Sequence, residues 1–249
     1  MENVSQTPKE SGVATKLTSK FLGITFGYMF IGLFITAAVC FGYSYFIASY
    51  FGTGDGYISS DGLLVVSIST VVAFILSYII TFANSIYSTK TGKAPWVGFI
   101  LYAICMGVAF SVILLAGIDF ETIGEALAIT ALSFGVMFFI GYFTKTDLSP
   151  LVFALLALLI CIALAVAFYG VLYLINPNLV SLLDFGVGIA IILFCLITVT
   201  IEANRIGAMV EQGQGNNNLA LYCAFNLYTN FITLFVRILF ILLASKKRK

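Results

Sequence analysis

Seven long apolar segments, separated by short polar stretches, fill most of this 249-residue chain. A helix needs about 20 mostly apolar residues to cross a hydrocarbon core roughly 30 Å thick, and each segment reaches that length. Helices are expected because a backbone in lipid must satisfy its own hydrogen bonds. The segments are too long and too uniformly apolar for the alternating strands of a membrane barrel. The predicted spans cover approximately residues 21–46, 63–86, 96–117, 122–143, 150–174, 180–203 and 217–244.

Basic residues occur in alternate connections between these segments. Lys or Arg is found in the first 20 residues, in the loops after the second and fourth spans and directly after the sixth span, whereas the other three loops contain neither. Because cytoplasmic loops carry the excess of Lys and Arg, we expect a cytoplasmic N-terminus. We divide the chain into a cytoplasmic tail (residues 1–20), a seven-helix membrane domain (21–244) and a basic C-terminal tail (245–249).

The C-terminal tail conflicts with this orientation. Seven crossings would place its four consecutive basic residues, 246–249, outside the cytoplasm. Either the tail is exported against the rule, or the last apolar segment is re-entrant and the tail returns to the cytoplasm. Residues 217–244 are long enough to cross, so we favour seven full spans.

Composition narrows the class of protein. Hydrophobic residues make up 61% of the chain and charged residues 9%, with a mean hydropathy of +1.09, which excludes a water-soluble domain. The chain has no histidine, which excludes Ser–His catalysis and histidine-ligated zinc. We expect no enzymatic activity and no cofactor. A net charge of +1 gives no reason to expect a nucleic-acid partner. The five cysteines all fall inside spans, where they pack as small apolar residues.

Charged residues inside spans are costly and therefore need an explanation. Asp184 lies early in the sixth span, Glu202 at its cytoplasmic end, and Arg237 in the seventh span. Counting along antiparallel helices places Asp184 and Arg237 at similar depth near the outer face, so we expect them to form an ion pair. Glu202 precedes Arg205 by three residues, and an interfacial ion pair within one helix is the simpler interpretation of that spacing.

The last span carries an unusual set of polar residues. Asn226, Asn230 and Thr233 recur at intervals of four and three, which places them on one helical face, and Thr229 adjoins them. A polar stripe on an apolar helix faces protein or water rather than lipid, so we expect the last helix to be central. The stripe is either a set of interhelical hydrogen bonds, worth about 0.6 kcal/mol each, or the lining of a hydrated ion path.

Five segments together resemble motifs of the Bax inhibitor-1 family (transmembrane Bax inhibitor motif proteins), with its bacterial members as the nearest type. Residues 32–37 (GLFITA) are similar to the family's Gly-Leu-x-x-Thr-Ala, and residues 102–111 carry its Tyr-x-x-x-x-Gly-x-x-x-Ser. Residues 141–149 (GYFTKTDLS) resemble Gly-Tyr-x-Thr-Lys-x-Asp-Leu-Ser. Residues 202–206 (EANRI) and 227–235 (LYTNFITLF) resemble Asp-Thr-Gln-Arg-Ile and Leu-Tyr-Leu-Asp-Phe-Ile-Asn-Leu-Phe.

The resemblance implies a seven-helix bundle with the last helix central and a pH-sensitive calcium leak. In the family, an acid after the sixth helix and another in the seventh form a carboxylate pair that shares a proton. These positions correspond here to Glu202 and Asn230, and the amide of Asn230 cannot titrate. Both side chains still offer oxygen, which suits calcium. We therefore take Glu202 and Asn230 as the candidate gate and calcium ligands.

Three further residues are candidates for the ion path: Asn226, Thr233 and Arg205. Bacterial relatives use an arginine of the second helix as a latch on the carboxylate pair, but residues 63–86 contain no basic residue. Arg205 is our hypothesis for its replacement.

The leading interpretation is a passive cation channel, a calcium leak with pH modulation, whose partners are the lipid bilayer and the permeating calcium ion. The alternatives are a secondary transporter that uses the same polar face and a non-conducting interaction or stress-response protein. The sequence indicates no protein partner. The short loops favour a bacterial inner membrane. A cytoplasmic tail ending in basic residues 246–249 would instead fit a retrieval signal for the endoplasmic reticulum.

Overall fold

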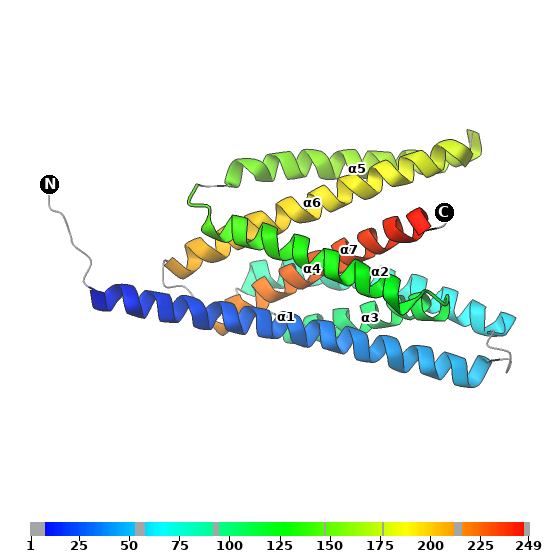
Figure 1. Cartoon of the computed structure of the whole chain (residues 1–249), viewed down its shortest axis with the longest axis horizontal. Helices are drawn as coiled ribbons and strands as arrows, with labels where there is room; N and C mark the ends of the chain where they lie inside the picture. The colour runs from blue at the N-terminus through cyan, green and yellow to red at the C-terminus, as the bar shows by residue number, and fades with distance from the viewer. Residues whose placement is uncertain are drawn as a thin grey trace. The chain divides into compact units, whose positions relative to one another are not determined.

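The computed structural model describes residues 8–52, 58–91, 95–146, 148–175, 177–211 and 216–246. This part of the chain forms seven helices, all long and apolar enough to cross a membrane, which confirms an all-α integral membrane protein with seven spans. Figure 1 shows them in chain order. Their bounds are α1 Pro8–Phe51, α2 Ser60–Thr91, α3 Trp96–Leu115, α4 Phe120–Phe143, α5 Ser149–Ile175, α6 Pro177–Glu211 and α7 Asn217–Lys246.

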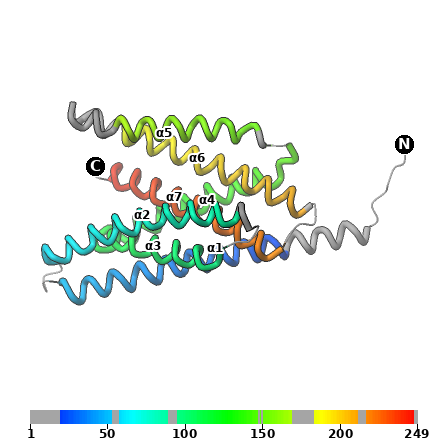
Figure 2. The backbone as a smooth tube through the Cα atoms, turned by 180° about the vertical axis from the view of Figure 1, so that it is seen from behind, coloured from blue at the N-terminus to red at the C-terminus, as the bar shows by residue number. Residues whose placement is uncertain are grey.

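The helices belong to two compact units. The first comprises residues 1–119 and 215–228, and the second comprises residues 120–214 and 229–249. In the first unit α3 packs along both α1 and α2, and in the second unit α6 packs along both α4 and α5. The tube in Figure 2 shows α5 beside α6 along much of its length. The continuous helix α7 contributes its first part to one unit and its second part to the other.

Two glycines from the motif segments allow helices to approach closely. A Cβ atom on Gly107 of α3 would lie 2.6 Å from the Cβ of Val39 and 2.8 Å from the carbonyl oxygen of Thr36, both on α1. A Cβ atom on Gly141 of α4 would lie 2.1 Å from the carbonyl oxygen of Thr200 on α6. Small residues at such contacts let backbones meet where no hydrophobic effect drives helices together. These motif glycines are therefore explained by packing.

Two helices extend furthest beyond the spans predicted for them. α1 begins at Pro8, so most of the predicted tail is helical, and α6 continues eight residues beyond residue 203, to Glu211. Proline is favoured in the first turn of a helix because it has no N–H to lose. In the extension of α6, Ile206 and Val210 are buried, one turn apart. Hydropathy locates the membrane, whereas a helix ends where its packing and hydrogen bonding end.

α7 provides much of the buried core. Its fully buried side chains include Leu227 and Tyr228 in the first unit and Leu234 in the second. α5 is the opposite case, since none of its span from Pro150 to Phe168 is buried. The burial of α7 agrees with the central place that its polar stripe predicts for it.

Candidate functional site

The polar residues of α7 lie on its less buried face. Asn226, Asn230 and Thr233 are each partly buried, and Arg237 continues the same spacing by four residues. The neighbours on the opposite face of the helix are buried almost without interruption from Ala220 to Leu239. The stripe therefore follows the accessible side of a helix that is otherwise enclosed in protein. Within the stripe, the hydroxyl of Thr233 donates to the carbonyl oxygen of Thr229 at 2.8 Å.

The structure brings Glu202 and Arg205 together on α6. The nearest charged atoms are 3.8 Å apart, and the side chain of Glu202 is 16% exposed while that of Arg205 is 51% exposed. This is the ion pair within one helix that the spacing predicts. Glu202 is thus a largely shielded carboxylate beside a half-exposed cation. Among the described residues, no group of three or more His, Cys, Asp or Glu side chains gathers around it or elsewhere.

Asn204, between these two residues, ties α6 to the end of α4. Its amide nitrogen donates to the carbonyl oxygens of Thr144, at 2.6 Å, and Gly141, at 3.4 Å. The carbonyl of Gly141 also accepts from the backbone N–H of Thr144 at 3.3 Å, so the amide of Asn204 chiefly supplies a donor to the Thr144 carbonyl, just beyond the end of α4. The contact joins the motif segments at 141–149 and 202–206. The sequence alone did not single out Asn204 as an interhelical contact, although a polar amide within a motif segment near the end of a span favours such a contact.

The predicted pair of Asp184 and Arg237 is not formed. The ion pairs within the described residues join Glu202 to Arg205 and Glu125 to Lys246. The prediction assumed that the sixth helix ends near residue 203. Because α6 continues to Glu211, Asp184 lies 27 residues from its end and Arg237 lies 20 residues from the start of α7. The equal spacing from the two helix ends on which the prediction rested is therefore lost.

Motif residues of α1 and α3 hold the buried face of α7. The hydroxyls of Thr36 and Tyr228 form a hydrogen bond, and the Thr36 hydroxyl also lies 3.2 Å from the carbonyl oxygen of Ala103. The ring of Tyr228 meets those of Tyr102 and Phe99 edge to face, with centroids 5.6 and 5.7 Å apart. These contacts are all within the first unit. They give the segments at 32–37 and 102–111 a structural role.

The far end of α7 is fixed to the start of α4. The ammonium of Lys246 lies 3.0 Å from a carboxylate oxygen of Glu125 and donates to the hydroxyl of Thr122 at 2.9 Å. α7 is continuous over 30 residues, which is about 45 Å, so the last apolar segment is a full-length helix and not a re-entrant one. Its end meets the first turns of α4, opposite the end that Lys145 follows. The ion pair with Glu125 gives the charge of Lys246 a partner at this end of α7.

The fold and this polar face define an integral membrane protein with seven spans whose last helix combines buried packing with a polar stripe. A family model described as "Inhibitor of apoptosis-promoting Bax1" matches residues 18–248, almost the whole chain. The chain therefore belongs to the Bax inhibitor-1 family. A comparison with curated proteins finds no match.

Proposed function

We propose that this protein is a passive cation leak, with calcium as the permeant ion, and that the ion moves along the polar face of α7. The observation that supports the proposal most directly is that Asn226, Asn230 and Thr233 coincide with the accessible side of a helix whose other side is buried. Polar side chains are disfavoured against lipid, and a stripe devoted to interhelical bonding would be enclosed. Membership of a membrane protein family agrees with this role.

The chemistry of the path follows from its side chains. Amide and hydroxyl oxygens of α7 replace part of the hydration of a hard cation. Glu202 supplies the negative charge, and Arg205 neutralises it at 3.8 Å while remaining half exposed. A cation that approaches the carboxylate competes with Arg205, and displacement of the guanidinium opens the site. Arg205 thereby acts as the latch, and Glu202 with Asn230 forms the gate.

The gate depends only weakly on pH in this proposal. Two neighbouring carboxylates share a proton and respond steeply to pH, whereas a carboxylate beside an amide does not. Asn230 carries no titrating proton. Calcium flux into liposomes should therefore change little between about pH 6 and pH 8, and Asn230→Asp should introduce a steep dependence. A steep dependence in the unaltered protein would mean that Glu202 titrates with another partner.

The decisive experiment is calcium flux into liposomes that contain the purified protein. Arg205→Ala should raise the flux, and Glu202→Gln should lower it about tenfold, since a bond to a charged group is worth about 1.5 kcal/mol or more. Asp184→Asn removes an exposed carboxylate from the same helix and is the matched control. Unchanged flux in Arg205→Ala would remove the latch from the proposal. Flux that runs uphill with a proton or sodium gradient would indicate a transporter, and no flux above empty liposomes would favour a non-conducting interaction protein.

The same proposal includes the orientation. We place the N-terminus in the cytoplasm of a bacterial cell and the C-terminus outside, because basic residues mark one side of the membrane. The contact of Lys246 with Glu125 supports an external tail, since it lies at the end of α4 opposite Lys145. A retrieval signal for the endoplasmic reticulum would need that tail in the cytoplasm. We propose no enzymatic activity, no cofactor and no nucleic-acid partner.

A further inference from the structure

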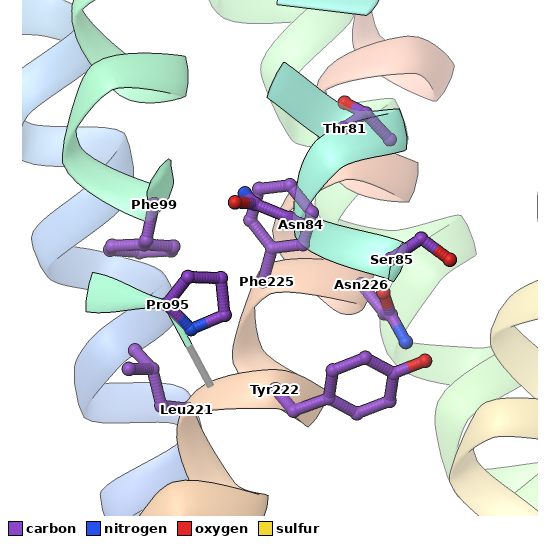
Figure 3. Close-up of a pocket in the computed structure, with 9 residues that line it drawn as sticks. All are labelled: Thr81, Asn84, Ser85, Pro95, Phe99, Leu221, Tyr222, Phe225 and Asn226. Atoms are coloured by element: carbon purple, nitrogen blue, oxygen red, sulfur yellow. The ribbon is translucent and has the colours of Figure 1, made fainter. Parts of the chain in front are cut away.

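A cavity of about 140 Å³ lies within the first unit, between the end of α2, the start of α3 and the first turns of α7. Figure 3 shows its lining. Orientation by charge places the end of α2 and the starts of α3 and α7 on the cytoplasmic side. We call it the Asn84 cavity. It is lined by Thr81, Asn84, Ser85, Pro95, Phe99, Leu221, Tyr222, Phe225 and Asn226.

Asn84 is the unusual residue in this lining. Its side chain is only 7% exposed, and its amide nitrogen has no hydrogen-bond partner among the described residues. A buried donor without a partner costs about 1–3 kcal/mol, so it marks a place where water or a ligand is needed. The amide of Asn84 packs directly against Gly98 of α3. Only glycine leaves room for it there, because a Cβ atom on residue 98 would clash with the amide oxygen. The side chain of Asn84 therefore contacts the backbone of α3 on one side and lines the cavity on the other.

The chemistry of the lining suits a hydrated cation. None of the lining residues is charged, and five of them carry a hydroxyl or an amide oxygen that can face a cation. The rings of Phe99, Tyr222 and Phe225 add aromatic faces, which attract cations. A volume of about 140 Å³ holds several water molecules, each of which can accept a hydrogen bond from Asn84.

One residue of the polar face of α7 lines the cavity. Asn226 lines it, and Asn230 lies one turn further along the same helix, about 6 Å away. We propose that the Asn84 cavity is a water-filled entrance through which the cation reaches this polar face, and that Asn84 sets its width. This inference rests on the proposed leak and adds the route of entry to it.

Accessibility to a charged thiol reagent tests whether the cavity contains water. Thr81 lines the cavity, whereas its neighbour Phe82 is at the same depth on α2 but 71% exposed on the outer surface of the helix. Thr81→Cys should react with a membrane-impermeant cationic methanethiosulfonate at least about tenfold faster than Phe82→Cys, because only a hydrated thiol ionises. The unaltered chain gives the background of the five native cysteines. Equal rates would overturn the inference.

Calcium flux tests whether the cavity is the entrance. Gly98→Ala would push the amide of Asn84 into the cavity and should lower the flux several-fold. Adding Asn84→Ala removes the clash and should restore it, which separates obstruction from misfolding. Unchanged flux in Gly98→Ala, or no recovery in the double variant, would overturn the inference and leave the leak standing. Absence of flux in the unaltered protein would overturn the leak and the entrance together, while the thiol reaction would still report whether the cavity holds water.

Discussion

α5 and α7 are both membrane spans, but they meet opposite surroundings. α5 is the most apolar of the seven spans, and none of its residues from Pro150 to Phe168 is buried in protein. α7 carries four asparagines, several hydroxyl groups and an arginine, yet it shares the largest buried fraction with α3. In water the apolar helix would be the hidden one. In a bilayer lipid is as apolar as leucine, so apolar helices face lipid and helices with polar groups are enclosed by protein.

The contacts that each helix makes with its neighbours also contribute to the difference in burial between α5 and α7. α5 packs along α6, so most of its circumference remains available to lipid. α7 is fixed by a buried hydrogen bond and aromatic contacts at one end and by an ion pair at the other. Its polar face is the part of the helix that these contacts leave accessible. The following four changes test this contrast in order of decreasing expected effect.

Truncation of an apolar side chain should be severe in α7 and mild in α5. Leu227 is fully buried, and Leu164 is 65% exposed. Leu227→Ala should lower the free energy of unfolding by about 3 kcal/mol, because a cavity remains in a packed core. Leu164→Ala should lower it by less than about 1 kcal/mol, because lipid fills the space. Unfolding by titration with a denaturing detergent measures both, and equal losses would contradict the contrast.

Removal of one buried hydroxyl should have an intermediate effect. Tyr228→Phe deletes the hydrogen bond to Thr36 but keeps the ring, so the free energy of unfolding should fall by about 1 kcal/mol. A double variant with Thr36→Val should show that the two losses are not additive. Tyr45→Phe, on an exposed side chain, is the matched control. Full additivity would mean that the pair does not stabilise the contact between α1 and α7.

The polar stripe should matter more for flux than for stability. If Asn230 only glued helices together, Asn230→Leu would cost about 0.6 kcal/mol of unfolding free energy and leave calcium flux unchanged. We expect the reverse, with flux clearly reduced and a smaller change in stability, because the residue lies on the accessible face. Measuring calcium flux and unfolding free energy on the same preparation distinguishes an interhelical hydrogen-bonding role from a role in the ion path.

The ion pair at the end of α7 should have the smallest effect. Lys246 and Glu125 are both nearly half exposed, so solvent screens their attraction. Lys246→Met should lower the free energy of unfolding by no more than about 0.5 kcal/mol. Glu125→Gln should cost as little, and the double variant should cost no more than either. A loss of several kcal/mol would show that this contact, and not the buried face, anchors α7.

The sequence predicted correctly those features that depend on a single local property, such as hydropathy or the spacing of residues within one helix. Every predicted span lies in one helix, apart from residues 116 and 117 at the end of the third, where Gly117 adopts a φ of 69° just beyond α3. The pair of Glu202 and Arg205 follows from a spacing of three residues within one helix. The pairing of Asp184 with Arg237 was wrong. It rested on counting from a helix end near residue 203, whereas α6 continues to Glu211, and hydropathy does not report where a helix ends.

The sequence by itself determined that the chain is a seven-span membrane protein of a recognisable family, because bilayer thickness and backbone hydrogen bonding leave few other solutions. It also determined the polar stripe, since helical periodicity is a local property. The tertiary structure alone decided which side of α7 is buried and which end of α4 meets Lys246. It alone placed Asn84 of one helix beside Gly98 of another at a cavity. Such contacts join residues distant in sequence, and their geometry depends on how closely whole helices pack.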